Sequence, residues 1–170
     1  MVITNAALSN PNVKALVYID ALIPDQGEST AQLTSAKPGS CLAGNPTTTF
    51  NTVPYPGGSA SDVDLYVRPS LFPSCFGNDL PASTSAVLAS TQRPLAKSAN
   101  TEPSGAPAWK TIPTWALVGT VDQVIPPAEL LFMAQRARAH VVQVHAGHLS
   151  MISQPTAVTN LIVAAANATP

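Results

Sequence analysis

The chain has 170 residues, of which 45% are hydrophobic and 10% charged, and its formal net charge is −1. This length suits one domain with its own core, while only 8 Lys and Arg residues exclude the dense basic surface that nucleic acids and anionic membranes require. No apolar run approaches the roughly 20 residues that span a bilayer, and no signal peptide is recognisable, so we expect a small neutral molecule as partner. Oligomeric state stays open.

Residues 1–24 predict a helix, a short turn and a strand. Ile3, Ala6 and Ala7 share one helical face, and Asn10-Pro11-Asn12 ends the helix. Residues 14–19 form a continuous apolar run, which is typical of a strand buried on both faces of a parallel sheet. Because a helix between parallel strands is a crossover connection, we expect a further strand upstream of this helix.

Residues 25–112 carry many of the 17 prolines and most of the glycines, and their periodicity is weak. We predict a short strand at residues 63–67 and a helix at residues 83–90, with Val87 and Leu88 turned inward. A segment of this kind between sheet strands is interpreted as a cap over a pocket, with a disordered linker as the alternative. Four large apolar residues favour the packed cap, namely Leu71, Phe72, Phe76 and Leu80.

Two cysteines, Cys41 and Cys75, lie in this middle part. If oxidised, they would close a long loop and stabilise the fold by about 3 to 4 kcal/mol. Two unpaired thiols are the alternative, and the choice depends on export, which the low charged fraction favours for the parent protein. Two cysteines far apart without a nearby histidine do not predict a metal site, and we expect no cofactor.

Residues 113–170 have the clearest pattern: strand, helix, strand, helix. The strands are predicted at residues 115–118 and 141–144, and the helices start at Pro126-Pro127 and at Pro155. This order predicts one right-handed crossover unit and a covering helix. The inner helix faces are expected to carry Leu130, Met133, Ala134 and Ala137 in the first helix, and Val158, Leu161, Ile162 and Ala165 in the second.

An acid and a histidine follow the last two predicted strands. Asp122 comes after the first of them, and His145-Ala-Gly-His148 comes after the second. This order matches the second half of a Ser…Asp…His triad in α/β-hydrolases. No G-x-S-x-G motif occurs in the chain, and Gly57-Gly-Ser59-Ala-Ser61 lacks the last glycine. The pattern therefore predicts hydrolase chemistry without its nucleophile.

The chain resembles the α/β-hydrolase superfamily, in particular its esterase-like branch with a small cap. Gly119-Thr-Val-Asp122 and Gly147-His148-Leu-Ser resemble the acid and histidine loops of the family, and residues 1–7 resemble the helix after the nucleophile elbow. The resemblance implies a partial α/β-hydrolase fold in which the C-terminal part of a parallel sheet is flanked by helices. It implies one incomplete domain over residues 1–170, with a cap insertion at about 25–112, that starts just after the elbow.

The resemblance gives Asp122 and His148 the roles of triad acid and base. Asp122 would fix the imidazole tautomer, and a turn acid or helix cap is its alternative. His148 would move the serine proton, and a structural loop histidine is its alternative. His145, Ser150 and Ser153 are not expected to be catalytic, nor are the cysteines, and Trp109 and Trp115 are expected in the core.

Three functions remain open. The chain could be an inactive fragment of an ester hydrolase that acts on a small neutral ester. It could be a non-catalytic binding or interaction protein that keeps the hydrolase pocket. In the third case a separate chain supplies the serine.

Overall fold

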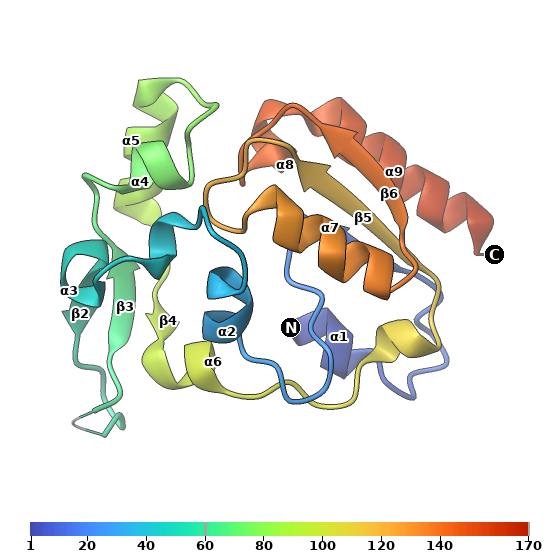
Figure 1. The fold of residues 1–170 in the computed structure, drawn as a ribbon, viewed down its shortest axis with the longest axis horizontal. Coiled ribbons are helices and arrows are strands. Elements are labelled where there is room, and N and C mark those ends of the chain that lie inside the picture. Colours follow the sequence, from blue (N-terminus) through green and yellow to red (C-terminus); the bar gives the residue numbers. More distant parts are fainter. Residues whose placement is uncertain (60, 170) are drawn as a thin grey trace.

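The computed structural model describes residues 1–59 and 61–169, and it divides into an α/β unit and a middle segment, which we define as residues 25–112 (Figure 1). The α/β unit contains α1 (Val2–Ala6), β1 (Leu16–Ile19), β5 (Thr114–Gly119), α7 (Pro127–Arg136), β6 (His140–Val144), α8 (Ser150–Ser153) and α9 (Pro155–Ala168). The middle segment contains α2 (Thr30–Ser35), η1 (Cys41–Ala43), α3 (Pro46–Thr49), β2 (Phe50–Val53), β3 (Asp64–Val67), α4 (Phe72–Cys75), α5 (Ala82–Thr91), β4 (Leu95–Ala96), α6 (Lys97–Thr101) and η2 (Ala108–Lys110).

The α/β unit is built on a parallel sheet in the order β1-β5-β6. Leu16 is paired with Thr114, and Trp115 is paired with His140. All six residues of β5 are buried, because this central strand has a partner on each side and a helix on each face. The predicted fold class, a parallel sheet with flanking helices, is confirmed.

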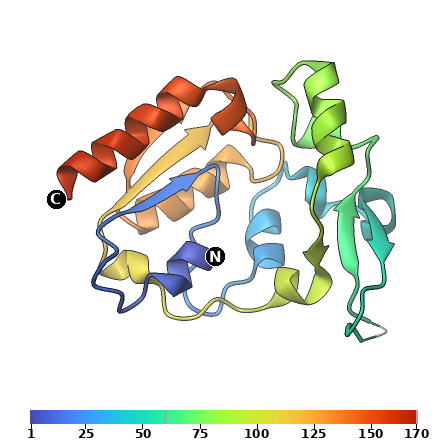
Figure 2. The same cartoon turned by 180° about the vertical axis from the view of Figure 1, so that it is seen from behind.

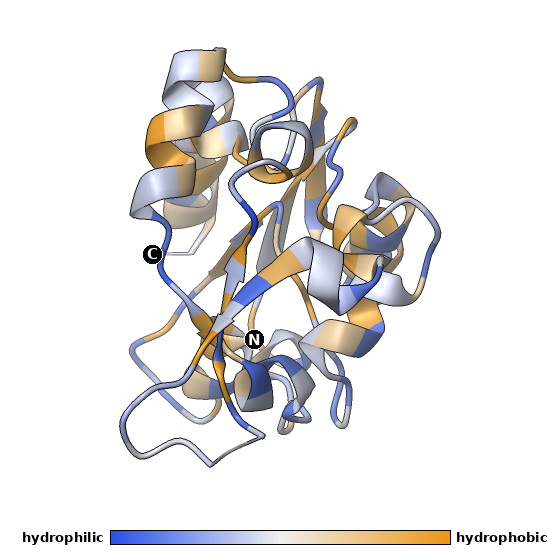
Figure 3. Ribbon diagram, turned by 90° about the vertical axis from the view of Figure 1, so that its left-hand side faces the viewer, coloured by the Kyte–Doolittle hydropathy of each residue, from blue (hydrophilic) through white to orange (hydrophobic). Residues whose placement is uncertain are grey.

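The two helices α7 and α9 cover opposite faces of this sheet, as the views from the two sides show (Figures 1 and 2). Alternate strand residues serve the two faces: Tyr18 and Val118 belong to the core cluster that contains α7 residues, whereas Trp115 and Leu117 pack with α9. Apolar residues on the strands and on the facing helices appear as orange bands in Figure 3. The sheet therefore has a core on each side.

The predicted inner face of α7 is confirmed, since Leu130, Met133, Ala134 and Ala137 are all buried. In α9 the prediction is wrong at Ile162, which is 47% exposed, because only one narrow stripe of this outer helix meets the sheet. The strand β6 is less buried than β5, since it lies at the edge of the sheet and exposes Val141 and Val142.

The first helix buries only Ala7 of the three residues predicted to share one face. Thr4 and Ala7 are buried, whereas Ile3 and Ala6 are exposed. The Thr4 hydroxyl lies 2.9 Å from the Tyr18 hydroxyl, so a polar contact connects α1 to β1. Ile3 and Ala6 instead line an open groove of about 480 Å³ beside β1.

The middle segment is folded rather than a linker. Its strands form a small antiparallel sheet in the order β2-β3-β4, and a third apolar cluster around Val67 and Phe72 packs beside it. The predicted helix exists as α5, but Val87 is 61% exposed, while Ser85 and Ala89 form its buried face and Leu88 is half-buried. Inward packing of Val87 was a wrong prediction because the opposite stripe makes the contacts: Ala89 packs in the cluster that contains Phe72 of α4, and Ser85 Oγ donates to the Gly77 carbonyl at 3.2 Å.

The middle segment is attached to the α/β unit at its start and at its end. Arg136 at the end of α7 forms a two-pronged ion pair with Glu28, at 2.6 and 2.7 Å, and this contact lowers the pKa of the Glu28 carboxyl. Trp109 Nε1 donates to the Pro24 carbonyl at 2.7 Å.

None of the helices in residues 1–59 and 61–169 has the length and apolar character needed to cross a bilayer.

Candidate active site

The carboxyl ends of the three parallel strands meet at one edge of the sheet, where ligands bind in open α/β sheets. Each strand is followed by a polar side chain: Asp20 after β1, Asp122 after β5 and His148 after β6. We name residues 120–126 the acid loop and residues 145–149 the histidine loop. The topology thus brings together the two residues that sequence reasoning selected, and adds Asp20.

Asp122 is fixed by the acid loop that carries it. Its side-chain Oδ1 accepts hydrogen bonds from the backbone N–H groups of Val124 at 2.7 Å and Ile125 at 3.0 Å. Its Oδ2 lies 2.9 Å from Nδ1 of His148. Because the residue is only 1% exposed, water does not compete for this carboxylate. Asp122 is therefore a turn acid through one oxygen and the histidine's partner through the other.

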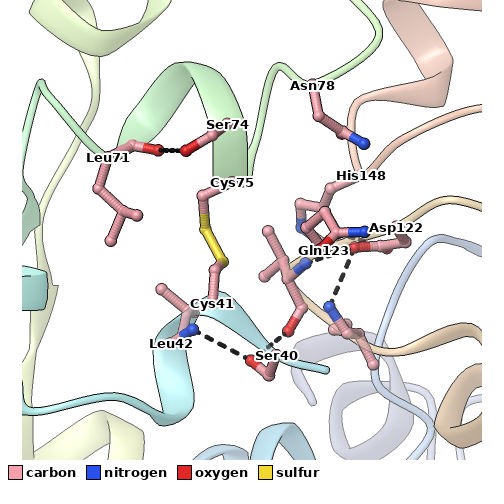
Figure 4. Close-up of a disulfide and its surroundings, with 12 residues drawn as sticks. Ser40, Cys41, Leu42, Leu71, Ser74, Cys75, Asn78, Asp122, Gln123 and His148 are labelled. Carbon is pink, nitrogen blue, oxygen red and sulfur yellow. Dashed lines mark hydrogen bonds and ion pairs between the residues drawn. A yellow bond between two sulfur atoms is a disulfide. The ribbon is translucent and has the colours of Figure 1, made fainter. Parts of the chain in front are cut away.

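His148 points its ring between Asp122 and the middle segment (Figure 4). Its Nδ1 faces the carboxylate, and the edge-on ring of Phe76 lies with its centroid 5.3 Å from that of the imidazole. The side chain is 19% exposed and lines a cavity. With Nδ1 engaged by Asp122, Nε2 is the ring nitrogen left to exchange a proton with a bound molecule.

Two glycines permit the close packing of the loops. A Cβ on Gly119 would lie 2.6 Å from the Ala146 carbonyl oxygen, so only glycine lets β5 approach the histidine loop at this point. A Cβ on Gly147 would lie 2.1 Å from Oδ1 of Asn78. The same Asn78 donates from Nδ2 to the Val121 carbonyl at 2.8 Å. The middle segment is thus seated against both loops.

The cysteines form a disulfide, Cys41–Cys75, as one of the two alternatives predicted. It lies close to the acid loop (Figure 4), because the Cys41 N–H donates to the Gln123 carbonyl at 2.8 Å and Ser40 Oγ donates to the Val124 carbonyl at 2.7 Å. The bond therefore ties two parts of the middle segment that both contact the site, and it removes both thiols as nucleophiles.

Asp20 is the site residue that sequence reasoning missed. It is 2% exposed, and its Oδ1 accepts the Gly119 N–H at 2.6 Å, while its Oδ2 accepts from the Ser150 hydroxyl. Burial raises its pKa to about 6, against the opposing effect of these two hydrogen bonds. A signal existed in the sequence, because an Asp directly after a buried apolar strand breaks the apolar pattern at the same strand end as Asp122.

A cavity of about 1020 Å³ opens beside His148. Most of its walls are apolar, and the ionisable side chains that line it are Asp20, Glu102 and His148. No Lys or Arg is among its lining residues in the described part of the chain. The apolar wall residues come from both parts of the molecule, and they are Met1, Val2, Ile19, Ala21, Leu22, Leu42, Phe76, Leu95, Ala99, Pro103, Val124 and Ile125.

The other candidates lie elsewhere or are otherwise engaged. His145 is exposed at the end of β6. Ser59 and Ser61 bond to each other in an exposed loop, and Ala60 between them lies outside the described residues. Trp109 and Trp115 are buried packing residues, as predicted. Within the described residues no group of three His, Cys, Asp or Glu side chains is arranged to hold a metal ion.

A parallel sheet with helices on both faces and with loop carboxylates and a histidine at its carboxyl edge defines an α/β protein of the hydrolase type. The model of the alpha/beta hydrolase family matches residues 1–161, and the chain belongs to this family. No curated protein matches its sequence.

Solved structures with a similar fold include several hydrolases. Polyneuridine aldehyde esterase has a TM-score of 0.68 and 14% identity, over 89% of this chain and 61% of that one. An extracellular α/β-hydrolase from a Paenibacillus species has a TM-score of 0.61 and 20% identity, over 89% and 61%. Pyrethroid hydrolase PytH has a TM-score of 0.62 and 20% identity, over 98% and 66%. The chain thus spans about 61% of the length of the first two, and these likenesses show the fold alone.

Proposed function

We propose that this chain is the part of an ester hydrolase that supplies the acid and the base of a serine triad, Asp122 and His148. The observation that carries the proposal is the contact of 2.9 Å between Asp122 Oδ2 and His148 Nδ1, in a buried setting at the carboxyl edge of the sheet. The second carboxylate oxygen is held by two backbone N–H groups, so the acid keeps its orientation without the histidine. This is the arrangement that a catalytic imidazole needs.

The chemistry follows from this arrangement. Asp122 holds a proton on Nδ1, so that Nε2 is free to accept the proton of an attacking serine hydroxyl. The imidazolium that results is stabilised by the buried carboxylate, and it returns the proton to the leaving alcohol. General base and acid catalysis of this kind contributes roughly 10²- to 10⁴-fold to a rate.

The serine is assigned to a segment outside these 170 residues. No G-x-S-x-G motif occurs in the sequence, and the chain spans about 61% of the first similar hydrolases. One edge of β1 has no partner strand among the described residues, and the groove lined by Ile3, Ala6 and Val17 lies beside it. An open strand edge and an open apolar groove suit the addition of further strands of a hydrolase sheet.

The cavity supports an uncharged ester with a bulky apolar group as substrate. Its volume of about 1020 Å³ exceeds what a short acyl chain fills, and its walls are mostly apolar. Glu102 lines it, and no lysine or arginine is among the described lining residues, so an anionic substrate would meet repulsion. The middle segment supplies Leu42, Phe76 and Leu95 to the wall and would act as the cap.

Kinetics of a longer protein that includes the upstream segment test this proposal. We expect hydrolysis of p-nitrophenyl esters by that protein and none by residues 1–170. His148→Ala and Asp122→Ala should each reduce kcat by several orders of magnitude, and the matched control His145→Ala should cost little, since that side chain is exposed.

Two results would redirect the assignment. An inactive longer protein that still binds neutral esters would favour a non-catalytic binding protein that keeps the pocket. Activity that appears only when a separate serine-bearing chain is added would favour complementation.

A further inference from the structure

We infer that Asp20 is a positioning residue that locks the histidine loop to the ends of β1 and β5, and so sets where His148 can act. The inference rests on the proposed function for the role of His148. Asp20 does not contact the imidazole in the manner of Asp122, and the proposed proton transfer does not use it. It is nevertheless a buried carboxylate at the same sheet edge, which calls for a physical role.

The Asp20 carboxylate bridges two elements that follow it by about a hundred residues or more. Oδ1 accepts from the backbone N–H of Gly119, the last residue of β5, at 2.6 Å. Oδ2 accepts from the hydroxyl of Ser150, the first residue of α8. One side chain on β1 therefore joins the strand that leads to Asp122 and the helix that follows His148.

The backbone at Asp20 is shaped for this contact. The residue has a φ of 44°, in the left-handed region, which costs a non-glycine residue about 1 kcal/mol or more. Its N–H still donates to the Leu117 carbonyl at 3.0 Å, so the parallel ladder continues to the residue itself. The turn thus ends β1 with the side chain buried between its neighbours.

The geometry connects this bridge to the position of the imidazole. Ser150 is two residues from His148, and hydrogen bonds fix both ends of the histidine loop. At its start, the N–H groups of Thr120 and Val121 donate to the carbonyls of Val144 and Ala146. At its end, Asp20 accepts the hydrogen bond of Ser150. Displacement of a catalytic group by about 1 Å can cost about 100-fold in rate. Releasing the end of this loop is therefore expected to lower kcat.

The chain offers variants that separate hydrogen bonding from charge. Asp20→Ala removes both hydrogen bonds, to Gly119 and to Ser150. Ser150→Ala removes only the second of them and changes the protein by a single oxygen atom. Asp20→Asn keeps an oxygen for the Gly119 N–H and an amide for the Ser150 hydroxyl, but removes the charge. Ser153→Ala is the matched control, because its buried Oγ on the same short helix has no hydrogen-bond partner among the described residues.

The experiment measures kcat and KM for a p-nitrophenyl ester, and the proton resonance of His148 Nδ1–H by NMR, in the longer hydrolase. We expect Asp20→Ala and Ser150→Ala to lower kcat about 10- to 100-fold with KM nearly unchanged, and to broaden the Nδ1–H resonance through faster exchange. Asp20→Asn should stay within about 3-fold of wild type, as should Ser153→Ala, because both keep the bridge.

The outcomes that oppose the inference are distinct. Unchanged kcat and an unchanged resonance in Ser150→Ala and Asp20→Ala would overturn it. An Asp20→Asn variant as impaired as Asp20→Ala would also overturn it, by showing that charge is what matters. If Asp20→Ala does not fold, Ser150→Ala decides. If the wild-type protein is inactive, the proposed function fails, while the resonance of His148 still tests the bridge.

Discussion

Replacement of Asp122 by asparagine should abolish catalysis without loosening the fold. In the structure Oδ1 accepts two backbone hydrogen bonds, from Val124 and Ile125, at 2.7 and 3.0 Å. An asparagine at this position must place its carbonyl oxygen there, because an amide NH₂ would oppose two N–H donors. Its NH₂ then faces Nδ1 of His148, where the carboxylate oxygen lies 2.9 Å away in the native protein.

This orientation forces the wrong tautomer. An NH₂ donor requires an unprotonated Nδ1, so the proton moves to Nε2, which can then no longer accept the proton of a serine. The same exchange in serine proteases lowers kcat about 10⁴-fold, or about 5 kcal/mol of transition-state stabilisation. Because the two turn hydrogen bonds survive, Tm should stay within a few degrees of the wild-type value.

The assay is ester turnover by the longer protein that the proposed function assumes, compared with its Asp122→Asn variant at saturating substrate, with thermal unfolding as the control for folding. His145→Ala serves as a second control of similar chemistry on the same loop. A loss of less than about 10-fold in a folded Asp122→Asn variant would refute the assignment of the acid.

Three further predictions concern stability. The chain of residues 1–170 by itself should be insoluble or molten, because β1 exposes an apolar edge; a sharp cooperative melt of a monomer would contradict this. Reduction of Cys41–Cys75, which spans 34 positions, should cost about 3 to 4 kcal/mol, measured by denaturant unfolding with and without reductant, and free-thiol labelling of the untreated protein would rule the bond out. Burial raises the pKa of Asp20 from 3.8 to about 6, so its contribution to stability is full below pH 3.8 and is lost as the pH rises through 6. The free energy of unfolding of Asp20→Asn, taken relative to that of wild type, should therefore increase by about 2 kcal/mol between pH 4 and pH 7. If this difference stays constant across that range, the carboxyl titrates normally.

The sequence was most informative where local pattern and topology agree. The apolar runs before Asp20, Asp122 and the histidine loop became the three parallel strands, because such runs fit the buried positions of a parallel sheet. The approach of Asp122 to His148 also followed from sequence, since the carboxyl ends of adjacent parallel strands meet at one edge.

The errors arose where tertiary contacts decide which face of an element is buried. Periodicity predicted that Val87 and Ile162 would face inward, but both are exposed. In α5 small residues form the buried face instead, and in α9 only a narrow stripe of residues meets the sheet. Asp20 was missed because its role depends on Gly119 and Ser150, which lie 99 and 130 residues further along the chain. The apolar run that ends at Asp20 marks a strand end, but it does not show which distant residues the carboxylate contacts.

Covalent labelling with a fluorophosphonate tests the central claim most directly. In the longer protein that the proposed function assumes, mass spectrometry of the labelled peptide should place the adduct on the serine of a G-x-S-x-G motif outside these 170 residues, and His148→Ala should abolish the labelling. An adduct on Ser150 or Ser153, labelling of residues 1–170 alone, or labelling that persists in His148→Ala would contradict the division of the triad described here.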